Sequence, residues 1–148
     1  MNKKILVLGV ALMAVAMLAT SVGGVLARPF CKDISVDKTY SMIYVEDHPE
    51  LLVIDLRPTT MFAIGHILDA INIPYIVLGP PGTTQNTAVL NAWIANEGQD
   101  HLNDKIIVHC IGGITSPNVA NMLIEAGFKK VYSMDGGFNA WVAAGYPH

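Results

Sequence analysis

Continuous runs of apolar residues alternate along the chain with more polar segments. Continuous apolar runs over 51–54 and 106–110 predict strands that are covered on both faces, which is typical of parallel sheets. Shorter apolar runs over 34–36, 70–74 and 130–132 predict further strands. Since helical patterns lie between these runs, we expect an α/β fold with a central, mostly parallel, five-stranded sheet and helices on both faces.

The stretches between the predicted strands carry helix start and stop residues. Ser116 followed by Pro117 suits the cap and first turn of a helix, and Gly127 is expected to end it. A second helix is expected over 86–97, where apolar side chains recur at helical spacing. The segment 78–84, rich in glycine and proline, is expected to be a turn-rich connector. Three more helices are predicted. The first has Asp37 as its cap, the second begins at Pro58, and the third follows Gly137.

The first 27 residues have the layout of a secretory signal peptide. Two lysines precede an uncharged, largely apolar stretch that ends in small residues at Ala27, where a signal peptidase would cut. The alternative is an uncleaved membrane anchor, because an apolar run of about 20 residues can span a bilayer. On either interpretation we expect the domain to be periplasmic or secreted. A flexible N-terminus is expected over 28–32 and the folded domain over 33–148.

Charge and composition exclude several classes of partner. Without the two lysines of the N-terminal stretch, the chain keeps seven basic residues against twelve acidic ones, a net charge of −5. No basic patch is visible, so nucleic acid is not an expected partner. A membrane is an expected partner only if the N-terminal stretch stays uncut. His48, His101 and His148 show no metal-ligand spacing, so we expect no metal site and no cofactor.

The strongest chemical candidate is Cys110, which lies at the end of an apolar run and before a loop with two glycines. A thiol in that position faces backbone N–H groups and the positive end of the helix predicted at Ser116, and both stabilise a thiolate. The sequence therefore predicts a nucleophilic cysteine that carries a negatively charged group. The alternative is an inert buried thiol. A disulfide with Cys31 is disfavoured, because Cys31 lies near the flexible start of the domain.

Several groups of residues, in order along the predicted domain, resemble the rhodanese-like single-domain sulfurtransferases. They are Val-Ile-Asp-Leu-Arg at 53–57, Gly-His-Ile and Ala-Ile-Asn-Ile-Pro within 65–74, Val-His-Cys and its loop over 108–116, and Asp-Gly-Gly-Phe-Asn-Ala-Trp to Tyr-Pro over 135–147. The resemblance implies the rhodanese-like three-layer fold. It also implies that Cys110 takes the outer sulfur of thiosulfate, a polysulfide or a persulfide. The cysteine would hold this sulfur as a persulfide and pass it to a thiol or cyanide.

The resemblance also assigns roles to the residues around the cysteine. The backbone N–H groups of the loop are expected to hold the terminal sulfur, and Ser116 is expected to cap the helix and add a donor. Asp55 and Arg57 are expected mainly to tie the strand end to neighbouring loops, and they remain candidate substrate-binding residues. The expected substrate-binding loop consists of Ile111, Gly112, Gly113, Ile114, Thr115 and Ser116.

Two departures from the family pattern bear on the substrate. Active relatives often have an arginine where Thr115 stands, and many have glutamate where Met61 stands. Because the loop is uncharged, we expect thiosulfate to be a poor donor and a neutral polysulfide or a protein persulfide to be a better one. The alternative function is a non-catalytic rhodanese module that binds a partner or senses redox state through its thiol.

The third class of function considered is that of the cysteine phosphatases, and the sequence of the loop argues against it. Such enzymes have an arginine at the position of Ser116. Without the guanidinium fork a phosphate cannot be held by two parallel hydrogen bonds. The resemblance instead implies that the loop between Cys110 and Thr115 is of the size that holds a single sulfur atom.

Overall fold

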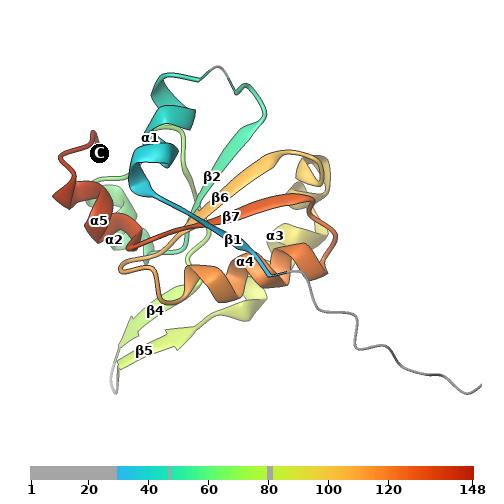
Figure 1. Ribbon diagram of the computed structural model, residues 1–148. Helices are drawn as coiled ribbons and strands as arrows, with labels where there is room; N and C mark the ends of the chain where they lie inside the picture. The colour runs from blue at the N-terminus through green and yellow to red at the C-terminus, as the bar shows by residue number, and fades with distance from the viewer. Residues whose placement is uncertain (1–29, 47, 80–81) are drawn as a thin grey trace, which may run out of the picture.

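A computed structural model describes residues 30–46, 48–79 and 82–148. The signal-peptide prediction for the first 27 residues lies outside these ranges. At the centre is a five-stranded sheet in the order β1-β7-β6-β2-β3, and every neighbouring pair is parallel (Figure 1). This sheet confirms the predicted α/β class. The strands are β1 (Lys32–Ile34), β2 (Leu51–Asp55), β3 (Ile71–Asn72), β6 (Lys105–His109) and β7 (Lys130–Met134).

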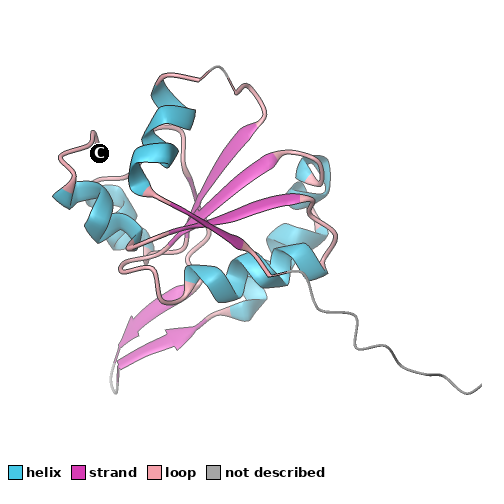
Figure 2. Cartoon of the chain, in the orientation of Figure 1, coloured by secondary structure: helices cyan, strands magenta, loops and turns pink. Residues whose placement is uncertain are grey.

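Helices cover both faces of the sheet (Figure 2). Neighbouring side chains of a strand point to opposite faces, so Ile106 and Val108 pack in one core and Ile107 packs in the other. Helices α3 and α4 close the first core, and α1 and α5 close the second. None of the helices in the described ranges is long and apolar enough to cross a membrane. The helices are α1 (Val36–Tyr44), α2 (Thr59–Ile64), α3 (Thr87–Ala95), the short 3-10 helix η1 (Glu97–His101), α4 (Ser116–Glu125) and α5 (Gly137–Ala143).

The predicted helix caps are partly wrong. Helix α1 is capped by Ser35, whose hydroxyl accepts a hydrogen bond from the N–H of Lys38 at 3.1 Å, and Asp37 lies inside the first turn. Helix α4 has Thr115 as its cap residue, without a side-chain hydrogen bond, and Ser116 is already helical. The hydroxyl of Ser116 is turned inward, so it is not available to cap the helix.

The predicted end of α4 is confirmed. Gly127 has a positive φ of 107°, and its N–H donates to the carbonyl of Ile124 at 3.0 Å. The next N–H, of Phe128, donates to the carbonyl of Leu123 at 3.1 Å. This pair of bonds is the Schellman motif, which a glycine adopts without steric cost.

The predicted turn-rich connector is wrong, because the chain forms a β-hairpin there. Strand β4 (Ile76–Gly79) pairs antiparallel with β5 (Gly82–Gln85), and Figure 1 shows the hairpin projecting from the body of the domain. Tyr75, buried at its base, donates its hydroxyl to Gln85 at 3.0 Å. The glycines and prolines over 79–82 interrupt the apolar pattern by which a strand is predicted, while the pairing still satisfies the backbone.

The ordered domain starts before the predicted residue 33. Lys32 is the first residue of β1, and the N–H of Cys31 donates to Asn121 Oδ1 at 2.7 Å. The Cys31 thiol donates to the carbonyl of Pro117 at 3.5 Å, and burial raises the pKa of this thiol. Cys31 and Lys32 thus contact the body of the domain, while the flexibility predicted for 28–32 stays a prediction. Cys31 and Cys110 are both free thiols in this structure.

Candidate active site at the carboxyl edge of the sheet

Cys110 follows β6 directly and lies at the carboxyl edge of the parallel sheet, where ligand sites of such sheets are found. Its side chain is buried, and its thiol donates to the hydroxyl oxygen of Ser116 at 3.6 Å. Ser133, at the end of β7, donates its hydroxyl to the same oxygen at 3.1 Å. Because Ser133 already donates to Ser116, the proton of Ser116 is free to turn toward the sulfur when Cys110 is ionised.

The loop after Cys110 presents unpaired backbone donors. Among the described residues, no acceptor contacts the N–H groups from Gly112 to Ser116. The last of these groups belongs to the first turn of α4, where the helix dipole favours negative charge. Gly113 has a positive φ of 81°, which lets the loop curl. A run of N–H groups without partners can hold an anion or a polarisable sulfur.

The start of α5 holds this loop in place. The N–H of Phe138 donates to the carbonyl of Cys110 at 2.8 Å, and the N–H of Asn139 donates to the carbonyl of Ile111 at 3.0 Å. A Cβ on Gly137 would lie 2.6 Å from the carbonyl oxygen of Cys110. The two backbones therefore meet at a distance that only glycine permits. This segment is part of the motif at 135–147 that resembles the family, and the resemblance alone predicts no role for it.

Asp55 and Arg57 form a buried ion pair at the end of β2. Arg57 Nε donates to both carboxylate oxygens of Asp55, at 3.0 and 2.9 Å, and Nη2 donates to Oδ2 at 2.6 Å. Nη2 also donates to the carbonyl of Gly65 at 2.8 Å, and the guanidinium carbon lies 3.4 Å from the ring centroid of Phe138. These contacts tie β2 to α5 and to the segment after α2, which is the expected structural role. Direct contact with a substrate stays a prediction for both residues.

The ring of His109 lies next to Asp55 of this ion pair and points away from the Cys110 thiol. Its ring stacks on Phe138 at 5.9 Å between centroids, in the core opposite the one that contains Cys110. Nε2 is 3.6 Å from Asp55 Oδ2, and neither ring nitrogen makes a hydrogen bond within the described part of the chain. Burial lowers the pKa of His109, although the charge of Asp55 opposes the shift. His109 is therefore a neutral, buried imidazole.

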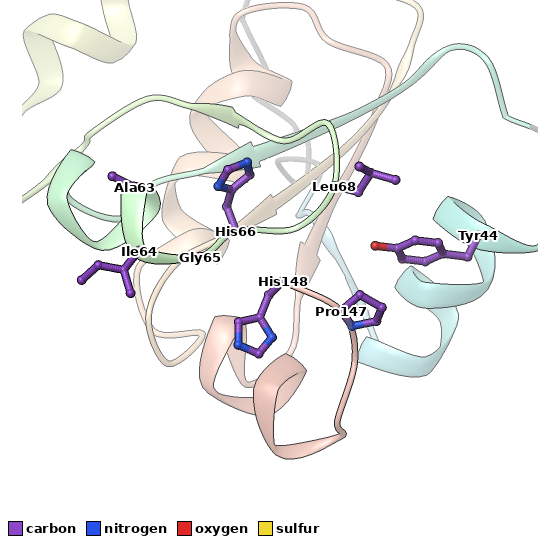
Figure 3. A pocket seen from close by; sticks show the side chains of 8 residues that line it. All are labelled: Tyr44, Ala63, Ile64, Gly65, His66, Leu68, Pro147 and His148. Atoms are coloured by element: carbon purple, nitrogen blue, oxygen red, sulfur yellow. The ribbon is translucent and has the colours of Figure 1, made fainter.

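Two cavities lie next to the end of α2 and the C-terminal residue His148, and neither is lined by Cys110 or by residues 111–116. The larger has a volume of 570 Å³ and is lined by Met61, Phe138 and Val142 among others. The second, of 430 Å³, is drawn in Figure 3, which shows His148 and Pro147 opposite Gly65 and His66. Ile64, Gly65 and His148 line both cavities. Within the described ranges, no three His, Cys, Asp or Glu side chains gather as metal ligands.

Comparison with known proteins identifies the family. Residues 36–144 match the family model of the rhodanese-like domain. The thiosulfate sulfurtransferase GlpE of Pseudoalteromonas translucida is 36% identical over 114 residues, which cover 76% of this chain and 90% of the relative. Thiosulfate sulfurtransferase 16 of Arabidopsis thaliana, a chloroplast protein, is also 36% identical, over 64% of this chain and 76% of the relative. The chain therefore belongs to the rhodanese-like family.

Solved structures agree with this assignment at the level of the fold. The rhodanese-like domain of an Anabaena protein superposes with a TM-score of 0.61 at 22% identity, and the match covers 78% of this chain and 76% of that one. A thiosulfate sulfurtransferase from Pseudomonas aeruginosa gives a TM-score of 0.60 at 20% identity, over 81% of this chain and 19% of the longer protein. The three-layer rhodanese-like architecture expected from the motifs is thus confirmed.

Proposed function

We propose that this protein is a sulfurtransferase that carries sulfur as a persulfide on Cys110. The observation that supports this most is the pairing of a thiol at the carboxyl edge of the sheet with unpaired N–H groups over 112–116. A terminal persulfide sulfur is negatively charged and polarisable, so it suits such donors. The relatives named thiosulfate sulfurtransferase support the same class of reaction.

The proposed reaction has two steps and needs no external oxidant. In the first, the Cys110 thiolate attacks the outer sulfur of a donor. A sulfur–sulfur bond forms to Cys110, the bond inside the donor breaks, and the leaving group departs with the electron pair, as sulfite when the donor is thiosulfate. In the second, a thiolate or cyanide attacks the terminal sulfur, and the Cys110 thiolate leaves with the electron pair.

Ser116 has a specific part in both steps. Its hydroxyl lies 3.6 Å from the sulfur of Cys110 and already accepts a hydrogen bond from Ser133. Its own proton can therefore stabilise the Cys110 thiolate that attacks in the first step and leaves in the second. Hydrogen bonds to ionised groups are about twice as strong as those between neutral groups.

We also propose that the domain works outside the cytoplasm. The support is the basic start, apolar stretch and small residues before position 28. N-terminal sequencing of the protein expressed from its full chain tests this proposal. A mature N-terminus at Arg28 in the periplasmic or secreted fraction is expected. An intact N-terminus found only in the cytoplasm would contradict it.

The sulfurtransferase proposal is tested by turnover. Thiocyanate formation from cyanide is measured with thiosulfate and with a polysulfide as donors, for the wild type, Cys110→Ala and Cys31→Ser. The wild type and Cys31→Ser are expected to turn over, and Cys110→Ala is expected to be inactive. Turnover that survives in Cys110→Ala, or a wild type inactive with every donor, would refute the proposal and favour a non-catalytic thiol domain.

A further inference from the structure

Three exposed lysines gather at the amino edge of the sheet. Lys32 is the first residue of β1 and Lys130 is the first residue of β7, and these strands pair in parallel, so their starts lie at the same edge. Lys129 directly precedes Lys130. The three lysines line a cavity of 360 Å³ together with Phe30, and no Asp or Glu lines it. The sequence does not reveal this lysine patch, because its members come from two distant segments.

The positive charges of the lysine patch have no carboxylate partner in the part of the chain that the structure describes. By contrast, Lys38 is paired with Glu46, and Arg57 is paired with Asp55. The chain as a whole is acidic, but at physiological salt charges more than about 8 Å away are largely screened. The patch therefore presents a local positive charge that is open to an anionic partner.

Phe30 adds an exposed apolar group to the same surface. Its side chain is 78% exposed, and it lines the cavity beside the lysines. An aromatic ring next to several lysines is typical of surfaces that lie on a membrane, because the ring enters the headgroup boundary while the ammonium groups meet anionic lipids. A soluble acidic segment would use the ammonium groups but would leave the ring in water.

The place of Phe30 in the chain favours the same partner. Only Arg28 and Pro29 separate it from Ala27, where the uncharged stretch of the predicted signal peptide ends. Since an extended chain spans at most about 3.6 Å per residue, Phe30 lies within about 11 Å of the end of that stretch. Before any cut, a stretch that lies in the bilayer therefore holds the lysine patch near the headgroups.

The lysine patch and the candidate active site lie at opposite edges of the sheet. Lys130 begins β7, whereas Cys110 follows the end of β6, and these two strands are parallel neighbours. A membrane that meets the amino edge of the sheet therefore leaves the Cys110 loop facing water, where soluble molecules can reach it.

We propose that the lysine patch and Phe30 form a docking surface for a membrane that contains anionic lipids. The ammonium groups meet the lipid phosphates, and the ring of Phe30 enters between the headgroups. Each lysine near such a surface favours binding by about fivefold, so the three together favour it by about 100-fold. The surface is the same whether or not the N-terminal stretch is cut, because all of its residues follow Ala27. It acts independently of sulfur transfer at Cys110.

Amine labelling tests this docking surface in the protein purified after expression of its full chain. A water-soluble acylating reagent is applied with phosphatidylcholine vesicles, with vesicles that also contain phosphatidylglycerol, and with soluble polyglutamate. Peptide masses give the labelling of each lysine. Phosphatidylglycerol should lower the labelling of Lys32, Lys129 and Lys130 by about tenfold or more and leave that of Lys38, an exposed lysine outside the patch, unchanged. Added salt should remove the protection.

Variants measure what each group contributes. Lys129→Gln combined with Lys130→Gln should remove most of the protection of Lys32, since two lysines together favour binding by about 25-fold. Phe30→Ser should weaken the protection about tenfold. Lys129→Arg combined with Lys130→Arg should keep it, and so should Lys38→Gln, the matched loss of one exposed charge.

Three results would overturn the inference. The first is equal labelling of the patch lysines on the two kinds of vesicle. The second is protection by polyglutamate without protection by phosphatidylglycerol, which would indicate a docking site for an acidic protein. The third is protection of Lys38 to the same extent as the patch, which would show that the lipid does not meet this face in particular.

Discussion

A methyl group added at Gly137 tests whether the start of α5 positions the Cys110 loop. Gly137 has a φ of +58°, and a Cβ there would lie 2.6 Å from the oxygen of Cys110 and 2.7 Å from the nitrogen of Gly113. Both atoms belong to the backbone, so no side chain can rotate away. Gly145 is the matched control, because its φ is +75° and a Cβ there meets nothing within 4 Å.

The structure sets the size of both effects. The left-handed conformation costs an alanine about 1 kcal/mol at either position. Overpacking at Gly137 adds about 2 kcal/mol, so Gly137→Ala should lose about 3 kcal/mol of unfolding free energy and Gly145→Ala about 1 kcal/mol. Ordinary contact begins near 3.4 Å, so the oxygen of Cys110 must move by about 0.8 Å from its distance of 2.6 Å. A displacement near 1 Å lowers a reaction rate by up to about 100-fold.

Urea unfolding measures the first effect, and single-turnover persulfide formation measures the second. Gly145→Ala should react at the wild-type rate, while Gly137→Ala should be slow even at urea concentrations where it is fully folded. Equal losses of stability in the two variants, or a wild-type rate in Gly137→Ala, would show that α5 does not position the loop.

Three other predictions concern the polar groups around the loop. Ser116→Ala should slow persulfide formation about tenfold, since one hydrogen bond to the ionised sulfur is lost, and should cost about 1 kcal/mol in urea unfolding because Ser133 loses its partner; the double variant with Ser133→Ala should regain stability but not rate. His109→Leu should flatten the pH dependence of unfolding. Burial lowers the pKa of His109 in the folded protein, so below the ordinary value of 6.5 only the unfolded chain binds the proton and the wild type loses stability as the pH falls; equal slopes in the two proteins would contradict this. Arg57→Met should cost about 3 kcal/mol or more in urea unfolding, because it leaves Asp55 buried and unpaired. The added change Asp55→Asn should recover part of that loss, and a single variant as stable as the wild type would count against a structural role for the pair.

Much of the site could be predicted because its residues are close in the sequence. The thiol, the glycines and the helix start lie within 110–117, and local patterns are enough to place them at a strand end. The parallel sheet could be predicted for a similar reason, since continuous apolar runs such as 106–110 fit a strand covered on both faces. Residues 36–144 then matched the family that these motifs suggested.

Other features depend on packing between distant segments and could not be predicted. Ser133 is 17 residues from Ser116, and its hydrogen bond arises because α4 packs against β7. The predicted cap is wrong because the helix already begins at Ser116 and Thr115 takes the cap position. The contact of Gly137 with the loop and the stacking of Arg57 on Phe138 also need the tertiary structure.

The central claim is that Cys110 accepts a sulfur atom, and intact-mass measurement tests it most directly. The wild type and Cys31→Ser are treated with a sulfane-sulfur donor, excess reagent is removed, and the intact mass of each protein is measured. Each should gain the mass of one sulfur, the gain should map to the peptide that contains Cys110, and cyanide should remove it. Cys110→Ala should gain nothing. A wild type that gains no sulfur from any donor, or a gain that maps to Cys31, would contradict the account.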